Sequence, residues 1–317
     1  MTVSHTKYAL ILNIFFSVTL ARAGTGDVTC YISADCGSGG GMSSNSGYSG
    51  NPSTGDSIKI NPAVVPTQQG IGLESLIFKG TPDFALVKGW GRVGSAISPS
   101  NSEETFFGPL GVEDKDQLLE RKLNQEKYPN QKFTFATAVN LFNSKGSGAR
   151  ASFSLGLLAR YNKVTNHISP GGGVSGILGP IYFGYSIYDD ETQLETSTEY
   201  PVNKPIRYQV QTYNVGLYLS SLLLDYSHLS QKEPHESNVN IFTASVMLKK
   251  FILTGSKRIE ESTRPAFNFD TSSLEEKPTK EDYFGGVQYI AGKHFLVGAM
   301  YNYYLLHEVS GVVTFFF

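Results

Sequence analysis

Large apolar side chains alternate with small or polar ones along most of this chain. From about residue 70 to the C terminus, the alternation recurs in segments of 8–14 residues. In 151–161, for example, Phe153 and Leu155 fall on one face, and Ser152 and Ser154 fall on the other. A period of two residues is the pattern of a β-strand with two different faces. The same pattern recurs in 133–141, 181–187, 222–227 and 294–303. We therefore predict an all-β protein.

The connections between these segments alternate between short and long. The short ones are Asn143–Gly148, Gly179-Pro180, Ser220-Ser221, Lys249-Lys250 and Gly292-Lys293, and the long polar ones are 98–130, 190–204 and 259–281. A soluble sandwich also has strands with two different faces. Short turns at one end, long loops at the other and a small or polar second face on many successive strands are typical of outer-membrane barrels. The pattern predicts a closed antiparallel transmembrane β-barrel.

The number of strands follows from counting these segments. They lie near 83–97, 131–143, 149–161, 168–178, 181–190, 205–219, 221–229, 238–248, 250–258, 282–290, 294–304 and 307–317. This gives 12 strands, an even number as single-chain bacterial barrels require. The segment 71–79 is also strand-like and would make thirteen, so it belongs to an internal plug or has an unrecognised partner near 57–62. We predict about 12 strands, with 14 as the alternative.

Composition and charge narrow the class further. Charged residues make up 17% of the chain, below the roughly 25% of a typical soluble domain. The formal net charge of −2 gives no overall field that would attract nucleic acid, so we expect no nucleic-acid partner. Beyond the N terminus, no apolar stretch approaches the roughly 20 residues of a membrane-spanning helix. These features exclude a polytopic helical membrane protein.

The N terminus predicts export from the cytoplasm. Residues 1–23 have a positive start at Lys7, an apolar segment and a small-residue end at Ala21-Arg22-Ala23, which together are typical of a signal peptide. Residues 24–70 form a Gly/Ser-rich N-terminal segment, either a plug or a periplasmic tail, before a barrel at 71–317. Its cysteines, Cys30 and Cys36, are most simply a small-loop disulfide in an exported chain, and they predict no metal site.

The last residues resemble the C-terminal signature of bacterial outer-membrane barrels. The chain ends in a strand-like segment with Val313 and Phe315 on one face and Phe317 at the terminus, although Gly311 stands where an aromatic residue is usual. In those proteins the signature is recognised by the insertion machinery. The resemblance implies that Phe315 and Phe317 are the assembly signal. It also implies the outer membrane of a Gram-negative-type bacterium as the location, with its lipid and the insertion machinery as partners.

Polar and charged residues on the second face are candidates for the lumen. If Ala85, Val87 and Val93 face lipid, then Lys88, Trp90 and Arg92 of the same strand point inward. The lumen-lining candidates are Lys88, Trp90, Arg92, Asn140, Arg160, Asn214, Asp225, Arg258, Gln288 and Asn302. Charged groups at membrane depth must face water or a partner. Arg92 and Arg160 opposite Asp225 are a possible pairing set, and the lumen is either conducting or filled.

Catalytic chemistry is not predicted. His228-Leu-Ser230 places a hydroxyl beside an imidazole, but it does not match the His-x-Ser-Asn-Gly pattern of outer-membrane phospholipases. Nothing else supplies a base and an orienting partner for a nucleophile. Asp189-Asp190-Glu191 lies at a strand–loop boundary and is interpreted as an exposed acidic loop. We expect neither an enzyme nor a cofactor.

A tripeptide before the first strands resembles a second family. Asn61-Pro62-Ala63 follows the glycine-rich segment, as an Asn-Pro-Ala does in the plug of outer-membrane long-chain fatty-acid transporters. The chain is shorter than that family's usual size, and Cys30 and Cys36 belong to no pattern of the family. The resemblance implies that 24–70 plug the lumen and that hydrophobic ligands pass through a gap in the wall. A Pro-bounded turn leading into the barrel is the other interpretation.

These observations favour a barrel that passes small or hydrophobic solutes, either as a channel or like those transporters. The alternative is a non-transport surface barrel. In that case the long loops 98–130 and 259–281 would bind a partner or anchor the envelope.

Overall fold

A computed structural model of the chain describes fifteen stretches of residues. They are 61–65, 67, 69–77, 82–100, 132–145, 150–163, 165–192, 206–219, 221–231, 237–262, 266–268, 273–275, 279–292, 294–302 and 309–316. The predicted signal peptide, the Cys30–Cys36 disulfide and Phe317 lie outside these residues. So does most of the predicted N-terminal segment.

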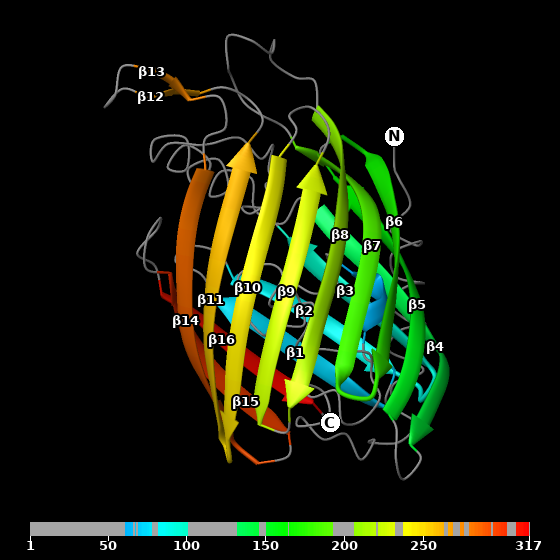
Figure 1. The fold of residues 1–317 in the computed structure, drawn as a ribbon. Coiled ribbons are helices and arrows are strands. Elements are labelled where there is room, and N and C mark those ends of the chain that lie inside the picture. Colours follow the sequence, from blue (N-terminus) through cyan, green and yellow to red (C-terminus); the bar gives the residue numbers. More distant parts are fainter. Residues whose placement is uncertain are drawn as a thin grey trace.

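The described residues form a closed antiparallel barrel of fourteen strands (Figure 1). The strands are β1 (Gly70–Ile77), β2 (Pro82–Gly89), β3 (Val93–Ser100), β4 (Lys132–Lys145), β5 (Arg150–Asn162), β6 (His167–Leu178), β7 (Ile181–Thr192), β8 (Ile206–Leu219), β9 (Leu222–Gln231), β10 (Ser237–Leu248), β11 (Phe251–Ser262), β14 (Thr279–Ile290), β15 (Phe295–Asn302) and β16 (Val309–Phe316). A hairpin of β12 (Ala266–Asn268) and β13 (Ser273–Glu275) lies between β11 and β14. No helix in the described stretches is long and apolar enough to cross a membrane.

Closure joins the first strand to the last. β1 pairs with β16 in antiparallel register, with Leu73 opposite Phe315 and Gly72 opposite Phe316. A closed ladder leaves no strand edge, so the backbone groups of each strand can find partners on its neighbours. The predicted closed antiparallel barrel is confirmed.

The predicted count of twelve strands is wrong, and the structure has the alternative number. The segment near 83–97 is two strands, β2 and β3, separated by the exposed turn at Trp90, Gly91 and Arg92. Gly91 adopts a φ of +103°, a value that side-chain-bearing residues rarely adopt, and this allows the reversal. The strand-like segment near 71–79 is β1, the first barrel strand, and its partners are β2 and β16 rather than residues near 57–62.

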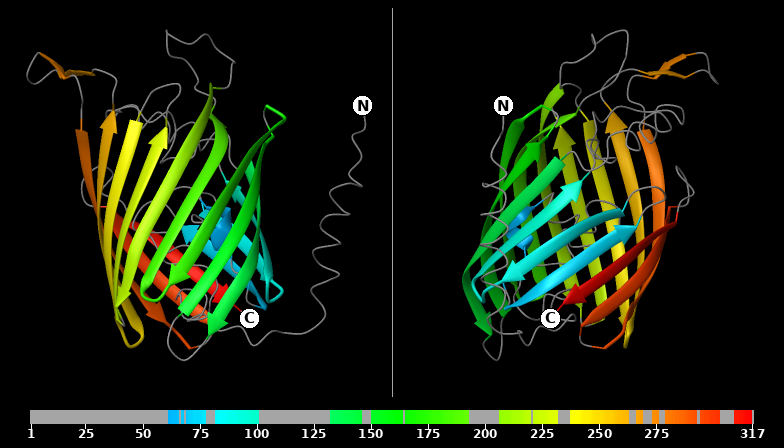
Figure 2. Two further views of the ribbon diagram at one scale, coloured as in Figure 1. Left: turned by 45° about the vertical axis from the view of Figure 1, so that its right-hand side comes forward. Right: turned by 180° about the vertical axis from the view of Figure 1, so that it is seen from behind.

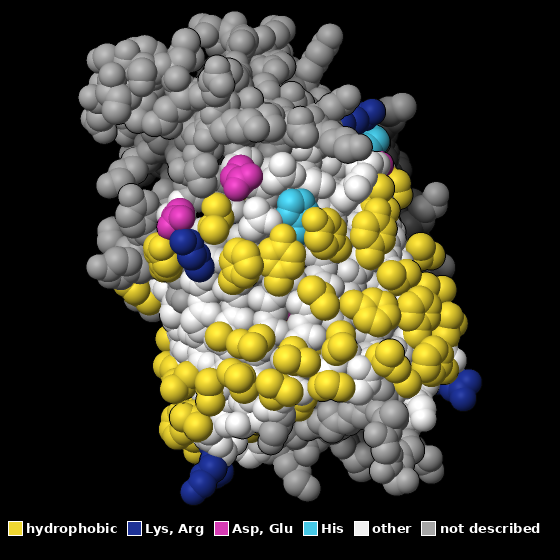
Figure 3. Space-filling view, in the orientation of Figure 1, with side chains coloured by type: hydrophobic (Ala, Val, Ile, Leu, Met, Phe, Trp, Pro, Cys, Tyr) yellow, Lys and Arg dark blue, Asp and Glu magenta, His cyan; other side chains and the backbone are white. Residues whose placement is uncertain are grey.

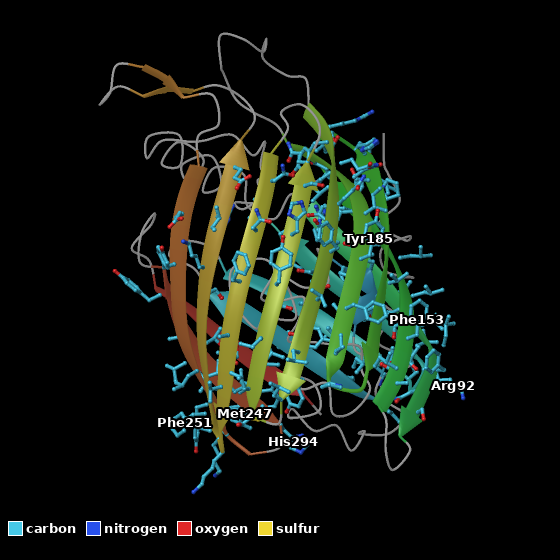
Figure 4. The ribbon with its side chains drawn as sticks, in the orientation of Figure 1. Arg92, Phe153, Tyr185, Met247, Phe251 and His294 are labelled. Carbon is cyan, nitrogen blue, oxygen red and sulfur yellow. The ribbon has the colours of Figure 1, made fainter. Side chains whose placement is uncertain are left out.

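The two faces of the wall carry different side chains. Exposed apolar residues such as Leu155, Leu157 and Phe183 point outward, and Figure 3 shows hydrophobic side chains gathered in a belt around the visible face. The labelled aromatics Phe153, Tyr185 and Phe251 belong to this outer face in Figure 4. Buried residues alternate with them and face the lumen, including Ser152, Ser154 and Gly156 on β5.

At two boundaries of the described barrel, both strands continue beyond the point where their pairing stops. β6 and β7 pair only from Gly171–Tyr188 down to Leu178–Ile181. β2 and β3 pair only between Leu86–Gly89 and Gly94–Ile97. In both cases the missing part lies toward the end of the barrel that carries the long loops. We call this end the loop end; the short connections are at the turn end.

Candidate functional site in the barrel lumen

A short turn of the chain lies against the inner wall of the barrel. Residues 61–65, here called the luminal turn, contain the 3-10 helix η2 (Pro62–Val64). The Asn61 side-chain oxygen accepts a hydrogen bond from the Ala63 amide at 3.0 Å and so caps the turn. Proline suits the first helical position because its φ is already fixed and its missing N–H has no helical partner. Asn-Pro-Ala therefore folds locally because each residue type fits its place.

Two hydrogen bonds, from the Asn61 side chain and to the Ala63 carbonyl, join the luminal turn to the wall. The Asn61 side-chain nitrogen donates to the Val174 carbonyl on β6 at 3.1 Å. The Ser175 hydroxyl on the same strand donates to the Ala63 carbonyl, also at 3.1 Å. Asn61 is only 2% exposed. Its amide thus uses its oxygen to hold the turn and its nitrogen to hold the wall, which a shorter or apolar side chain could not do.

Three glycines make room for this contact. Gly156 on β5, Gly173 on β6 and Gly184 on β7 occupy lumen-facing positions. A Cβ at Gly156 would overlap the Pro62–Ala63 backbone, and one at Gly173 would overlap the Asn61 side chain. Figure 2 shows η2 in blue inside the barrel, beside these strands. Sequence reasoning missed the contact, although glycine at inward positions on three successive strands was an available signal.

The lumen beside this turn is apolar. Val65 packs in a buried cluster with Val87, Leu158, Tyr188 and Val210, together with Ala85, Ala96, Ala136, Ala138 and Tyr208. The expectation that Ala85 and Val87 face lipid is therefore wrong. They line the lumen, where the luminal turn gives them an apolar neighbour in Val65. The residues of this cluster are at most 5% exposed, so apolar side chains fill this part of the lumen beside the turn.

The wall beside this cluster has an incomplete ladder. His167–Pro170 of β6 pair with β5, and Asp189–Thr192 of β7 pair with β8, but these two segments do not pair with each other. We call this part of the β6–β7 boundary the upper seam. Pro170 has no N–H to donate, and it stands directly before the last paired residue, Gly171.

Buried ion pairs cross the upper seam on the lumen side. The Lys132 ammonium of β4 lies 2.9 Å from one carboxylate oxygen of Asp190 on β7. The Arg160 guanidinium of β5 pairs with the other oxygen, which also accepts from the Tyr208 hydroxyl at 3.1 Å. Lys132 and Asp190 are at most 1% exposed. Removing one partner of a buried pair leaves an uncompensated charge, at a cost of about 3–5 kcal/mol.

A second group of polar contacts bridges the seam beside these ion pairs. The Thr165 hydroxyl donates to one carboxylate oxygen of Glu191. His167 Nδ1 lies 3.5 Å, and Arg207 Nε 3.7 Å, from the other oxygen. Asp190 and Glu191 are therefore buried parts of β7, and the interpretation of 189–191 as an exposed acidic loop is wrong. Side chains, rather than backbone hydrogen bonds, connect β6 to β7 here.

The predicted lumen residues fall into several groups. Asn140, Arg160, Asp225, Arg258 and Gln288 are buried on the lumen side, and Asn214 is half-buried there. Asn302 belongs to β15, opposite Phe284, but its side chain is outside what the structure describes.

Three residues predicted to line the lumen do not face it. Lys88 is buried on the face of β2 opposite to Val87. Trp90 and Arg92 are exposed in the turn after β2, and Figure 4 shows Arg92 at the turn end. The expected Arg–Asp set therefore does not form as predicted: Arg160 pairs with Asp190, and Asp225 accepts from the Ser227 hydroxyl at 3.0 Å.

The opposite side of the lumen carries paired hydroxyl groups. Thr243 and Ser256 are 2.7 Å apart, and Ser245 and Thr254 are 2.9 Å apart, each pair joining β10 to β11. Within the described strands, no group of three or more His, Cys, Asp or Glu side chains could hold a metal ion.

Comparisons with known proteins found likeness only among solved structures. No family model matches the chain, and no curated protein matches it. The Vibrio cholerae outer membrane protein OmpT is 9% identical at a TM-score of 0.36, over 78% of this chain and 97% of that one. Salmonella typhi OmpF in complex with daunomycin is 6% identical at 0.40, over 78% and 96%. Acinetobacter baumannii Omp33 is 8% identical at 0.37, over 78% and 96%. These similar structures are outer-membrane barrels, but at such identities and TM-scores the likeness carries no argument about function.

Proposed function

We propose that this protein is an outer-membrane barrel that passes hydrophobic solutes and is kept closed by its luminal turn. The observation that carries the proposal is the docking of Asn61-Pro62-Ala63 on a wall hollowed by glycines, beside an apolar part of the lumen. This apolar cluster offers a permeating ion no groups to replace its water, which favours an apolar solute. The resemblance of the tripeptide to the plug of fatty-acid transporters agrees with this function.

The outer face supports the proposed location. A wall with many exposed apolar side chains would be costly in water and is favourable in lipid. Closure between β1 and β16 joins the two ends of the sheet, so neither end strand presents a free edge to the membrane. Outer-membrane lipid is thus the proposed surrounding. The insertion machinery that recognises a C-terminal aromatic strand is the proposed assembly partner.

The upper seam is the proposed side exit from the lumen to the membrane. Apolar side chains lie inside it, at Leu158 and Tyr188, and the exposed apolar Ile168 lies outside it. No backbone hydrogen bond between β6 and β7 must be broken to widen the seam. The side-chain contacts of Asp190 and Glu191 would have to part. The β2–β3 boundary is also incomplete. We favour the β6–β7 boundary because the charged side-chain contacts across it can hold it closed.

Two measurements together test the function. Cells that lack the protein should take up a hydrophobic fluorescent probe more slowly than cells that contain it. The purified protein in a planar bilayer should show no steady ion current, because the luminal turn remains docked. A steady open current, with no difference in probe uptake between the two strains, would contradict the proposal and indicate a plain pore.

The seam has its own test. A Pro170→Cys/Asp189→Cys variant, with Cys30 and Cys36 changed to Ser, can be joined by a short bis-maleimide on the outer face. If the seam is the exit, the joined protein should lose probe uptake. A Gly176→Cys/Phe183→Cys pair, which lies in the paired part of the same two strands, should retain uptake after joining. Equal uptake by both joined proteins would remove the seam from the route.

A further inference from the structure

One row of cross-strand partners runs along the inner wall from β2 to β9. In register order its members are Val87, Ala96, Ala136, Leu158, Gly171, Tyr188, Val210 and Gln231. A Cβ at Gly171 would overlap Leu158 and Tyr188, so these two side chains fill the space above the glycine. The row is therefore apolar from β2 to β8, and it ends at the glutamine on β9. We call it the Gln231 row.

The Gln231 side chain is an unused hydrogen-bonding group inside the barrel. It is 0% exposed, and neither its oxygen nor its nitrogen has a hydrogen-bond partner among the residues that the structure describes. Burial alternates along β9, and Gln231 falls on the buried, inward side with Ser227 and Leu229. A buried amide is costly unless it makes hydrogen bonds. Because this amide can donate and accept at once, it suits a ligand group that does the same.

The buried charges next to the row balance one another. Toward the loop end, the next inward residues on β5, β7 and β8 are Arg160, Asp190 and Tyr208. Lys132 and Arg160 both pair with Asp190, and Glu191 is the next residue of β7. All four charged residues are at most 2% exposed, so two buried cations stand against two buried carboxylates. An anionic ligand would lose its water without gaining a cation, at a far higher cost than a neutral polar group.

The luminal turn now covers part of the row. The turn lies against Gly156 and Gly173, which are one row nearer to the turn end, and its Val65 packs in one cluster with Leu158 and Val210. An alkyl chain could take the place of Val65 without burying a polar group. Leu158 and Gln231 are four strand spacings of about 4.8 Å apart, or roughly 19 Å along the wall. This span suits an extended apolar chain with one polar end.

We infer that the Gln231 row binds solutes that combine an apolar chain with one neutral hydrogen-bonding end, such as a primary amide or an alcohol. The Gln231 amide bonds to the polar end, and the chain lies along Val210 and Tyr188 in place of Val65. The same site discriminates against an ionised carboxylate on the same chain. The inference rests on the proposed function, because it names the class of solute that would displace the luminal turn.

Photo-crosslinking of the full chain in lipid vesicles tests the site. Three dodecyl probes carry a diazirine in the chain and end in a primary amide, a carboxylate kept ionised by alkaline buffer, or a methyl group. Mass spectrometry measures the adducts on Val210 and Leu229, the inward neighbours of Gln231. The amide probe should give about fivefold more adduct there than either other probe, the effect of one directed hydrogen bond. Gln231→Leu should lower the amide yield to that of the methyl probe and leave the methyl yield unchanged.

Gln288→Leu is the matched control. Gln288 is also an inward glutamine, 2% exposed, whose amide has no hydrogen-bond partner within the described residues. It lies on β14 opposite Ile252 and Gly298, outside the Gln231 row, so its loss should leave the amide preference unchanged. Heat-modifiable mobility on gels establishes that each variant is folded.

Three results would overturn the inference. They are equal adduct yields from the amide and methyl probes in the wild type, a carboxylate yield that matches the amide yield, and the same loss in Gln288→Leu as in Gln231→Leu. Adducts report binding rather than passage, so they are separable from transport. A preference for the amide probe that depends on Gln231, without any uptake by cells, would support the site and contradict the proposed function.

Discussion

Neighbouring strands are joined differently at β10–β11 and at β6–β7. β10 and β11 are twelve residues each and pair along all twelve. β6 and β7 are also twelve residues each but pair along only eight. On the β10–β11 side, luminal hydroxyls bond to the adjacent strand, as Thr243 does to Ser256. On the β6–β7 side, Lys132 on β4 reaches Asp190 on β7, past two intervening strands.

This difference distinguishes a purely structural part of the barrel from the candidate site. Hydroxyl pairs between neighbouring strands are short-range and neutral, and they add to a ladder that is already complete. The contacts of Asp190 and Glu191 replace a ladder that is missing, and the luminal turn docks beside them on β5 and β6. Side-chain contacts can be exchanged without unfolding a strand, whereas ladder hydrogen bonds cannot. Under the proposed function, the β4–β8 side is the one that would admit or release a solute.

The largest expected effect concerns closure, on which both sides depend. Phe315 lies on the outer face opposite Leu73, and its ring centroid is 5.5 Å from that of Phe295. Replacing Phe315 and Phe317 by Asp places two carboxylates on the strand that completes the barrel, at a cost on the order of several kcal/mol. The yield of folded barrel, measured by heat-modifiable mobility, should fall to a small fraction of wild type. A change of similar size between residues 101 and 130, outside the described strands, should leave it high; matching yields would refute the assembly role of the C terminus.

The next effect compares the polar contacts of the two sides. Asp190→Asn leaves Lys132 and Arg160 buried without their carboxylate, so the free energy of unfolding should fall by about 3–5 kcal/mol. Thr243→Val removes one neutral hydroxyl pair on the β10–β11 side and should cost about 1 kcal/mol. Urea unfolding of the reconstituted barrels would measure both. If the two variants lost the same stability, the charged contacts would have no special role at the seam.

A third prediction concerns the luminal turn and uses matched glycines. A leucine at Gly156 would overlap the Pro62–Ala63 backbone, and such overpacking costs about 1–3 kcal/mol. The docked state should lose population by about tenfold or more, and probe uptake should rise accordingly. Gly255 is an outward position of β11 with open space around it, so Gly255→Leu should leave uptake unchanged. Equal uptake by the two variants would mean that the luminal turn does not close the lumen.

Much of the fold could be predicted from the alternation of apolar and polar residues, but not the number of strands. The alternation predicts one strand for β2 and β3 because it continues on both sides of the three-residue turn around Gly91. It also predicts the wrong lipid-facing side for β2, for a related reason. Ala85 and Val87 are apolar like the outward Leu86, so polarity did not distinguish the lumen side from the lipid side. The lumen is apolar there because Val65 packs against it.

The site was harder to predict than the fold. Asn61-Pro62-Ala63 could be singled out because the turn it forms is local. Its partners Gly156 and Val174 lie about a hundred residues away and depend on barrel curvature and register. Arg160 was correctly placed on the inner face, but its carboxylate was not identified. Asp190 lies on a strand that is not adjacent to β5, and no sequence periodicity encodes such a contact.

The central claim is that the luminal turn must leave the wall before a solute can pass. In an Ala63→Cys/Ser175→Cys variant, with Cys30 and Cys36 changed to Ser, a disulfide would join the turn to β6 where the Ser175 hydroxyl now bonds to the Ala63 carbonyl. The measurement is hydrophobic-probe uptake by cells carrying this variant, before and after reduction. We predict uptake near that of cells without the protein while the disulfide is intact, and uptake near wild type after reduction. Wild-type uptake with the disulfide fully formed would contradict the account.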